Sequence, residues 1–462
     1  MRHKKAACFL FLSIFIYGYV FASESTVIGP FKAEDRVLIL APHPDDEAIG
    51  CAGIIQQALK AGSEVHVVYL TNGDHNEFAF IVYEKRITLR KGEFIHMGEV
   101  RRKEAVKAMK LLGLNENDLT FLGYPDFGTF TIFSKYWQDT KPYRGLLTRI
   151  SAVPYKNDLS YGAPYKGESI LKDLKNVLLD YQPTKIFVSH PADVNVDHKT
   201  FYLFLKVALH DLEGKIPKAV VYPYLIHCVG WPLPRQYHPE LGLEPPNKFL
   251  DSQINWQKFQ LSAEQLNNKH KAILCYRSQT ESSAFYLLSF ARKNELFGDY
   301  PDIELGKKTI ASKEKKVPEL FGFTKLFASL SNELEDFKDS AGDRGEVVYS
   351  IQDGSLVICI NKDEKVNRRI SAMLYLFGYS YKMPFAKMPK MRIITLYNRC
   401  KVFDGQKLIN TKDVKIDITD KSLILTVPLK MLGDPDYILT SLKAYTGTAP
   451  ADTIGFREIR MR

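Results

Sequence analysis

A short polar cluster follows the apolar run RVLIL, residues 36–40. In APHPDDEAIGCAG, residues 41–53, a histidine stands at position 43 and three acids stand at positions 45–47. Like charges repel at short range, and a carboxylate that leaves water is costly unless it is paired. The cluster therefore predicts either a bound cation or a position that lies open to water.

A second polar cluster follows a later apolar run. It reads SHPADVNVDHKT and contains His190, Asp193, Asp197 and His198. If the two apolar runs are neighbouring parallel strands, their carboxyl ends meet at one edge of the sheet, where open α/β sheets bind ligands. In that arrangement the two polar clusters face each other.

Together the two clusters supply the ligands of a metal site. His43 and Asp46 are three residues apart, so one turn can aim both at the same point, and His198 can reach it from the second cluster. Two imidazoles and one carboxylate, with an open position for water, are the composition of a catalytic zinc site, and nitrogen ligands favour zinc over magnesium. Asp45 is then left free as a base. A helix N-terminus alone would account for Glu47 but not for His43.

The elements that must position these residues alternate along residues 36–300. RVLILAP, EVHVVYLT, LTFLGYP, KIFVSH and KAVVYPYLIH have strand patterns, and helical patterns separate most of them. This alternation predicts a Rossmann-like α/β fold, with a mostly parallel sheet and helices on both faces. Two long loops, 126–165 and 229–260, interrupt the pattern, and loops of this length are usually functional or disordered.

The pattern changes after about residue 300. KKTIASKEKK is typical of a linker, and short alternating stretches separated by turn signals follow it. These stretches predict a C-terminal antiparallel β-sandwich. The chain is thus expected to contain an α/β domain at 34–300, a linker at 301–317 and a sandwich at 318–462.

The first 22 residues have the features of a secretory signal peptide. MRHKK is basic, the apolar run after it is short for a membrane span, and Val20 and Ala22 supply the small residues of a cleavage site. We expect a secreted or periplasmic protein, with an uncleaved membrane anchor as the alternative. Apart from Cys8, which lies within these 22 residues, the chain has five cysteines, and none of them has CxxC spacing. Buried thiols are therefore favoured over a disulfide framework, with one bridge as the alternative.

The chain carries a formal net charge of +10. Its Lys and Arg residues are spread along the sequence, which favours an ordinary solvated basic surface. Attraction to an acidic polymer or an anionic membrane face is the functional alternative. We find no nucleic-acid-binding motif, so nucleic acid is not an expected partner.

PHPDDE followed by DVNVDH resembles the PIG-L (LmbE-like) family of zinc-dependent de-N-acetylases. The resemblance covers about residues 34–300 and includes VRRKEAVKAMKLLGL, FLGYPD and KHKAILCYRSQT in the expected order. It implies that zinc is bound by His43, Asp46 and His198, that Asp45 is the general base, and that Arg101 and Asp126 contact sugar hydroxyls.

One position departs from the family pattern. Asn195 stands where the family usually has the first histidine of His-Pro-Asp-His, which polarises the carbonyl or protonates the leaving amine. Asparagine can donate a hydrogen bond to an oxyanion but cannot transfer a proton. Asn195 is therefore predicted to be a catalytic hydrogen-bond donor. Asp45 is the first candidate for returning the proton to the amine, and His190 is the second.

The resemblance implies an exported zinc-dependent deacetylase of the N-acetylglucosaminyl type, whose substrate is an amino-sugar glycan or glycoconjugate. Its partner would be an N-acetylated sugar or polysaccharide. LTVPLKMLGDPDYILTSLKAY and DTIGFREI give the C-terminal region a weak resemblance to carbohydrate-binding sandwich modules. The alternatives are a secreted carbohydrate-binding protein with a structural or degenerate metal site, and a metal-dependent hydrolase of another bond.

Overall fold

The computed structural model describes residues 28–85, 90–249, 254–305, 323–324, 345–362, 370–396, 399–419, 422–446, 449–453 and 455–461. The predicted signal peptide and most of the predicted linker lie outside these residues. None of the helices in the described ranges combines the length and the apolar character needed to cross a bilayer.

A seven-stranded sheet forms the centre of the N-terminal domain, in the order β3-β2-β1-β4-β5-β7-β6. Its strands are β1 (Arg36–Ala41), β2 (Glu64–Thr71), β3 (Leu119–Tyr124), β4 (Lys185–Ser189), β5 (Val220–Tyr224), β6 (Asn255–Gln260) and β7 (Asn294–Asp299). The strands from β3 to β5 pair in parallel, and β7 and β6 add an antiparallel edge. The predicted mostly parallel sheet is confirmed.

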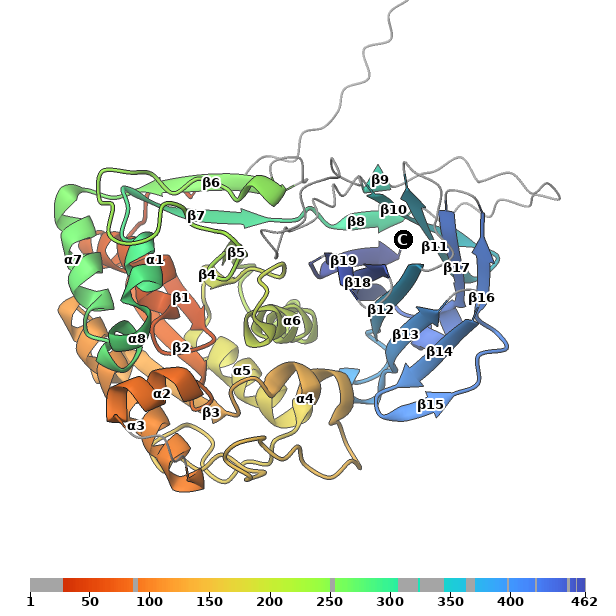
Figure 1. Cartoon of the computed structure of the whole chain (residues 1–462), viewed down its shortest axis with the longest axis horizontal. Helices are drawn as coiled ribbons and strands as arrows, with labels where there is room; N and C mark the ends of the chain where they lie inside the picture. The colour runs from red at the N-terminus through yellow and green to blue at the C-terminus, as the bar shows by residue number, and fades with distance from the viewer. Residues whose placement is uncertain are drawn as a thin grey trace, which may run out of the picture.

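Helices cover both faces of this sheet (Figure 1). They are α1 (Asp46–Lys60), α2 (Glu77–Glu84), α3 (Lys91–Leu111), α4 (Thr129–Lys135), α5 (Gly167–Tyr181), α6 (Val196–Asp211), α7 (Ala263–Ile273) and α8 (Arg277–Leu287). In β1, Val37, Ile39 and Ala41 belong to the core that contains α1, whereas Leu38 and Leu40 belong to the core that contains α6. Successive side chains of a strand point to opposite faces, so a strand covered on both sides is apolar throughout.

Two antiparallel sheets form the C-terminal region, as predicted. One has the order β16-β17-β11-β10-β9 and the other β15-β14-β13-β12-β18-β20-β8, with β19 paired to β18. The strands are β8 (Ile303–Leu305), β9 (Phe323–Thr324), β10 (Gly345–Gln352), β11 (Ser355–Lys362), β12 (Ile370–Tyr379), β13 (Lys390–Leu396), β14 (Arg399–Asp404), β15 (Lys407–Ile409), β16 (Lys415–Ile418), β17 (Ser422–Pro428), β18 (Tyr437–Thr446), β19 (Ala449–Thr453) and β20 (Arg457–Met461). Ile358 of β11 and Leu374 of β12 are buried in one shared core between the sheets.

The sandwich packs directly on the N-terminal domain. β8 lies within the range predicted as linker, yet it pairs in parallel with β20. Phe133 of α4 meets Phe377 of β12 edge to face, with the ring centroids 5.2 Å apart, and both rings are fully buried. α6 lies between the seven-stranded sheet and the sandwich in Figure 1, and its Phe204 also packs on Phe133. A buried aromatic interface therefore joins the two regions.

Candidate active site

Two loops at the carboxyl ends of β1 and β4 form the site. The two strands are adjacent and parallel, so their ends meet at one edge of the sheet, as the sequence interpretation required. The loop after β1 is held at Pro42, whose carbonyl oxygen accepts hydrogen bonds from N and Oγ1 of Thr71 at 3.0 and 3.2 Å. After β4, the Ser189 hydroxyl donates to the carbonyl oxygen of His198 at 2.8 Å. These bonds fix the loop after β1 to the end of the adjacent β2, and the start of α6 to the end of β4.

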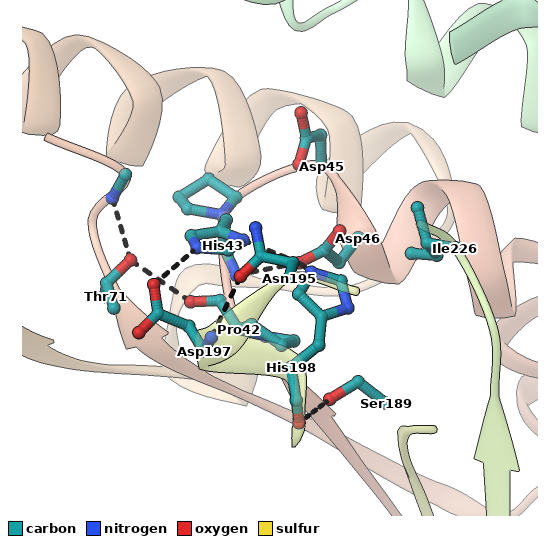
Figure 2. A network of polar contacts seen from close by, with 12 residues as sticks. Pro42, His43, Asp45, Asp46, Thr71, Ser189, Asn195, Asp197, His198 and Ile226 are labelled. Carbon is teal, nitrogen blue, oxygen red and sulfur yellow. Dashed lines mark hydrogen bonds and ion pairs between the residues drawn. The ribbon is translucent and has the colours of Figure 1, made fainter. Parts of the chain in front are cut away.

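His43, Asp46 and His198 converge on one point (Figure 2). Nδ1 of His43 and Nε2 of His198 lie 3.2 and 3.1 Å from the same oxygen, Oδ2 of Asp46. All three side chains are buried, and their ligand atoms lie within 4.8 Å of one another. The predicted juxtaposition of the two polar clusters is therefore present in the fold.

These three side chains fit a divalent metal ion. Nε2 of His198 is buried and, within the described residues, makes no hydrogen bond, although Asp46 lies close by. Burial lowers the pKa of His198, but the charges of Asp193 and Asp46 outweigh it and raise the pKa to about 9. Anionic surroundings attract a cation, and an unused buried imidazole nitrogen is the kind of group that a metal satisfies. Two imidazoles and a carboxylate match the ligands of catalytic zinc sites.

A carboxylate faces the second nitrogen of each of these histidines. Oδ2 of Asp193 lies 3.2 Å from Nδ1 of His198. Oδ1 of Asp126 and Oδ2 of Asp197 lie 3.1 and 3.3 Å from Nε2 of His43. Carboxylates in this position fix the tautomer and the orientation of metal-binding histidines. Asp126, predicted to contact a sugar hydroxyl, thus contacts His43 while it also lines the pocket.

The crowding of three acids after β1 is resolved because each carboxylate has its own partner. Asp46 faces the two histidines. Oδ2 of Asp45 lies 3.3 Å from Nη2 of Arg101. Glu47 accepts hydrogen bonds from the backbone N–H of Asp45, at 3.1 Å, and from the hydroxyl of Tyr276. Each of the three carboxylates therefore has a specific partner, unlike the acids of an ordinary helix N-terminus.

Asp45 has an unusual backbone conformation. Its φ is 125°, in a region that residues with side chains rarely adopt. Burial raises the pKa of Asp45 to about 7, while the charge of Arg101 acts in the opposite direction. A carboxyl group that titrates near neutrality is suited to accept a proton and to return it.

A pocket of about 330 Å³ lies over the site. Six predicted residues line it: His43, Asp45, Asp46, Arg101, Asp126 and Asn195. The seventh, His198, is fully buried and contacts Asp46 from below the lining. The remaining polar lining comes from His75, Asn76, His227, Gln279, Ser283 and Tyr286, and the apolar lining from Ile49, Phe127, Ile226 and Leu287.

Asn195 caps the N-terminus of α6. Its Oδ1 accepts a hydrogen bond from the backbone N–H of Asp197 at 2.9 Å. In Figure 2 the amide nitrogen of Asn195 points away from this cap, so its N–H groups remain able to donate in the pocket. His190, the second candidate for the acid, does not line the pocket, and its ring stacks on Trp256 with the centroids 5.5 Å apart.

Arg101 holds the loop that carries Asp45. Its guanidinium donates to the carbonyl oxygens of Gly73 and Pro44, at 3.1 and 2.7 Å, besides contacting the Asp45 carboxylate. The side chain is buried and lines the pocket. These contacts point to positioning of Asp45, and the predicted contact between Arg101 and a sugar hydroxyl stays a prediction.

Two pocket residues, His227 and Tyr286, were not singled out from the sequence. His227 follows β5, and its ring lies 4.6 Å from that of His198 between centroids. Oη of Tyr286 lies 3.4 Å from Nδ1 of His227. Burial lowers the pKa of His227 to about 4. The available signal was the position of His227 just after a parallel strand, at the edge where ligands bind.

The N-terminal part of the chain matches a known protein family. The family model described as GlcNAc-PI de-N-acetylase (PIG-L) matches residues 38–209. A curated relative from Bacteroides thetaiotaomicron, named as a glucosamine-6-phosphate deaminase-like protein, is 24% identical in an alignment of 288 positions that covers 54% of this chain and 36% of the relative. The chain thus spans little more than a third of the length of that relative.

Solved structures of deacetylases are also similar. An inhibitor complex of N,N'-diacetylchitobiose deacetylase from Pyrococcus horikoshii is 21% identical, with 55% of this chain and 74% of that chain covered and a TM-score of 0.33. The zinc-inhibited form of teicoplanin deacetylase is 15% identical, with 57% and 97% covered and a TM-score of 0.37. At these values neither protein's activity carries over to this chain.

Proposed function

Residues 38–209 form a domain of the PIG-L (GlcNAc-PI de-N-acetylase) family, and from this premise we propose an exported, zinc-dependent hydrolase that removes N-acetyl groups from an amino-sugar glycan or glycoconjugate. The observation that carries the proposal is the convergence of His43, Asp46 and His198 on one point, beside Asp45 at the base of the pocket that Asp45 lines. Three protein ligands and an adjacent base are the parts that metal-assisted amide hydrolysis needs.

His43, Asp46 and His198 would hold the zinc ion, with Asp193 and Asp197 orienting the two imidazoles. When bound, zinc supplies Lewis-acid polarisation of a carbonyl oxygen and makes a water molecule more acidic.

Asp45 accepts a proton from the attacking water, whose oxygen forms a bond to the acetyl carbon. The N–H groups of Asn195 are predicted to stabilise the negative charge that develops on the acetyl oxygen. Asp45 then returns its proton to the amide nitrogen as the carbon–nitrogen bond breaks. The products are acetic acid and a free amine. The second hydrogen of the water stays on the acid, which releases it to solvent as acetate forms, so each atom of the water is accounted for.

The test is acetate release from N-acetylglucosamine oligomers and from small N-acetylglucosamine glycosides by the purified protein. We expect release that a chelator abolishes and that added zinc restores, and strongly reduced release by Asp45→Asn. A protein that binds these sugars without releasing acetate would support the carbohydrate-binding alternative instead. Release of a different product would support a metal-dependent hydrolase of another bond.

Export is a separate part of the proposal. It is supported by the basic and apolar N-terminal sequence and by the small residues at Val20 and Ala22. N-terminal sequencing of the protein from the periplasm or medium should begin after Ala22. Recovery of the intact N-terminus in the membrane fraction would indicate the uncleaved anchor.

A further inference from the structure

The wall of the pocket next to His198 contains a histidine that the proposed mechanism does not use. His227 lines the pocket, and its ring meets that of His198 at an angle of 75°, with the centroids 4.6 Å apart. A group that lies against a metal ligand and faces the same pocket is within reach of the acetamide that the metal site would process.

The backbone holds His227 firmly at this place. Its N–H donates to Oδ2 of Asp193 at 2.8 Å, and its carbonyl oxygen accepts from the N–H of Val194 at 3.0 Å. The same Asp193 oxygen faces Nδ1 of His198 at 3.2 Å. A single carboxylate therefore sets the positions of the metal ligand and of His227 relative to each other.

The contacts of Tyr286 define which nitrogen of His227 is available. The Tyr286 hydroxyl donates its hydrogen to the carbonyl oxygen of Ile226 at 2.8 Å, so towards His227, 3.4 Å away, the hydroxyl oxygen can only accept. That arrangement places the ring hydrogen of His227 on Nδ1. Nε2, which makes no hydrogen bond to any described residue, then presents a lone pair.

Several other polar groups of the lining already have protein partners. Oδ1 of Asn195 caps α6, and Nδ2 of Asn76 donates to Oε1 of Gln279 at 2.8 Å. The carboxylates of Asp45 and Asp126 face Arg101 and His43. An acceptor held beside the metal ligands, with no protein donor of its own, is suited to an N–H group of the substrate.

We propose that His227 is a substrate-binding residue whose Nε2 accepts a hydrogen bond from the N–H of the scissile acetamide, so that the site selects amides over esters. The inference rests on the proposed deacetylase function and adds the origin of its specificity. An ester has oxygen where the amide has N–H, so it cannot donate this bond. A site built to pair with a substrate N–H discriminates strongly against an analogue that lacks it.

The test compares two substrates that differ only in this atom: an N-acetylated sugar that the wild type processes, and the same sugar with an acetyl ester at that carbon. The measured quantity is the ratio of kcat/KM for the amide to kcat/KM for the ester, because the ratio cancels losses that affect both substrates. His227→Phe keeps a ring but removes the acceptor. We expect the ratio to fall roughly 5- to 100-fold, the range for one buried group left without its partner.

Three further variants make the result specific. His227→Asn restores an acceptor oxygen and should recover part of the ratio. Tyr286→Phe removes the contact to Nδ1 and should lower the ratio less than His227→Phe. Asn195→Ser keeps a capping side chain for α6 and should leave the ratio unchanged, because an oxyanion donor serves the amide and the ester alike.

Zinc content, measured for every variant, separates a change in specificity from loss of the metal site. Equal losses on the amide and the ester in His227→Phe at full zinc occupancy, or an unchanged ratio, would overturn the role of His227 while leaving the deacetylase proposal standing. Absence of acetate release from every N-acetyl substrate by the wild type would overturn both.

Discussion

Oδ2 of Asp193 lies 3.2 Å from Nδ1 of His198 and also accepts the backbone N–H groups of Ile226 and His227, at 3.2 and 2.8 Å. The carboxylate thus fixes the orientation of the His198 ring, a proposed metal ligand, and connects the loop after β5 to it. Partners of this kind are typically worth 10- to 100-fold in metal affinity or activity. We expect Asp193→Asn to lower zinc affinity by about that factor without abolishing binding.

The comparison is with His43→Ala and His198→Ala, which each remove a proposed ligand and should lose most of the zinc. His75→Ala is the matched control, because His75 lines the same pocket but does not belong to the group of ligand atoms. Zinc content after dialysis at controlled free metal concentrations checks all four variants. Full occupancy in both ligand variants would contradict the site.

Asp45→Asn should keep the metal and lose most of the activity. The substitution preserves the size of the side chain but removes the group that accepts the proton, and general-base assistance is typically worth about 10²- to 10⁴-fold. The measurement is kcat/KM for acetate release at matched zinc occupancy. An active variant would exclude Asp45 as the base, and a variant without metal would show that Asp45 is needed for binding instead.

Arg101→Lys distinguishes the two roles considered for Arg101. Lysine keeps the positive charge but cannot reach Asp45 and the carbonyl oxygens of Gly73 and Pro44 in one planar arrangement. If Arg101 positions the base, kcat should fall by about tenfold or more while KM changes little. A rise in KM with kcat unchanged would favour the predicted contact with a sugar hydroxyl.

Phe377→Ala should destabilise both domains. Phe377 belongs to the sandwich but is fully buried against Phe133 of α4, and truncation of such a ring typically costs about 3–5 kcal/mol in the free energy of unfolding. All three tryptophans, Trp137, Trp231 and Trp256, belong to the N-terminal domain.

Denaturant unfolding followed by tryptophan fluorescence therefore reports on the domain that does not carry the mutation. We expect the fluorescence midpoint to fall in Phe377→Ala, because the interface couples the two domains. Leu408→Ala, at a side chain that is 58% exposed on β15, is the control and should leave the midpoint unchanged. An unchanged midpoint in Phe377→Ala would mean that the domains unfold independently.

The cluster of candidate metal ligands could be predicted because its parts lie at the ends of strong local patterns. β1 and β4 are apolar runs, each directly followed by polar residues, and only the assumption that the strands are neighbours was needed to bring His43 and His198 together. His227 was harder to find, because its relevance depends on the position of β5 beside β4 in the sheet. Strand order is a tertiary property that local periodicity does not contain.

The antiparallel edge of the seven-stranded sheet was missed for a different reason. Glu295 of β7 is buried. A strand is recognised from its apolar residues at buried positions, so a buried glutamate obscures the pattern. Lys269 of α7 donates to Glu295 at 2.9 Å, and the backbone N–H of Gly53 in α1 donates to it at 2.8 Å. Partners from two distant helices thus satisfy a charge that the sequence alone shows as unfavourable. β8 was assigned to the linker because three residues are too few to form a recognisable pattern.

Asp45, the proposed base, has a backbone conformation that lowers the stability of the fold. At a φ of 125° a side chain is strained, typically by about 1–3 kcal/mol, and only glycine would be relaxed there. Asp45→Gly and Asp45→Ala both remove the carboxylate, so their difference in stability isolates this strain, and the glycine variant should be the more stable one. Selection for a robust fold alone would favour glycine at this position. In this chain an aspartate occupies a conformation that weakens the fold, as expected of a residue whose value is chemical rather than structural.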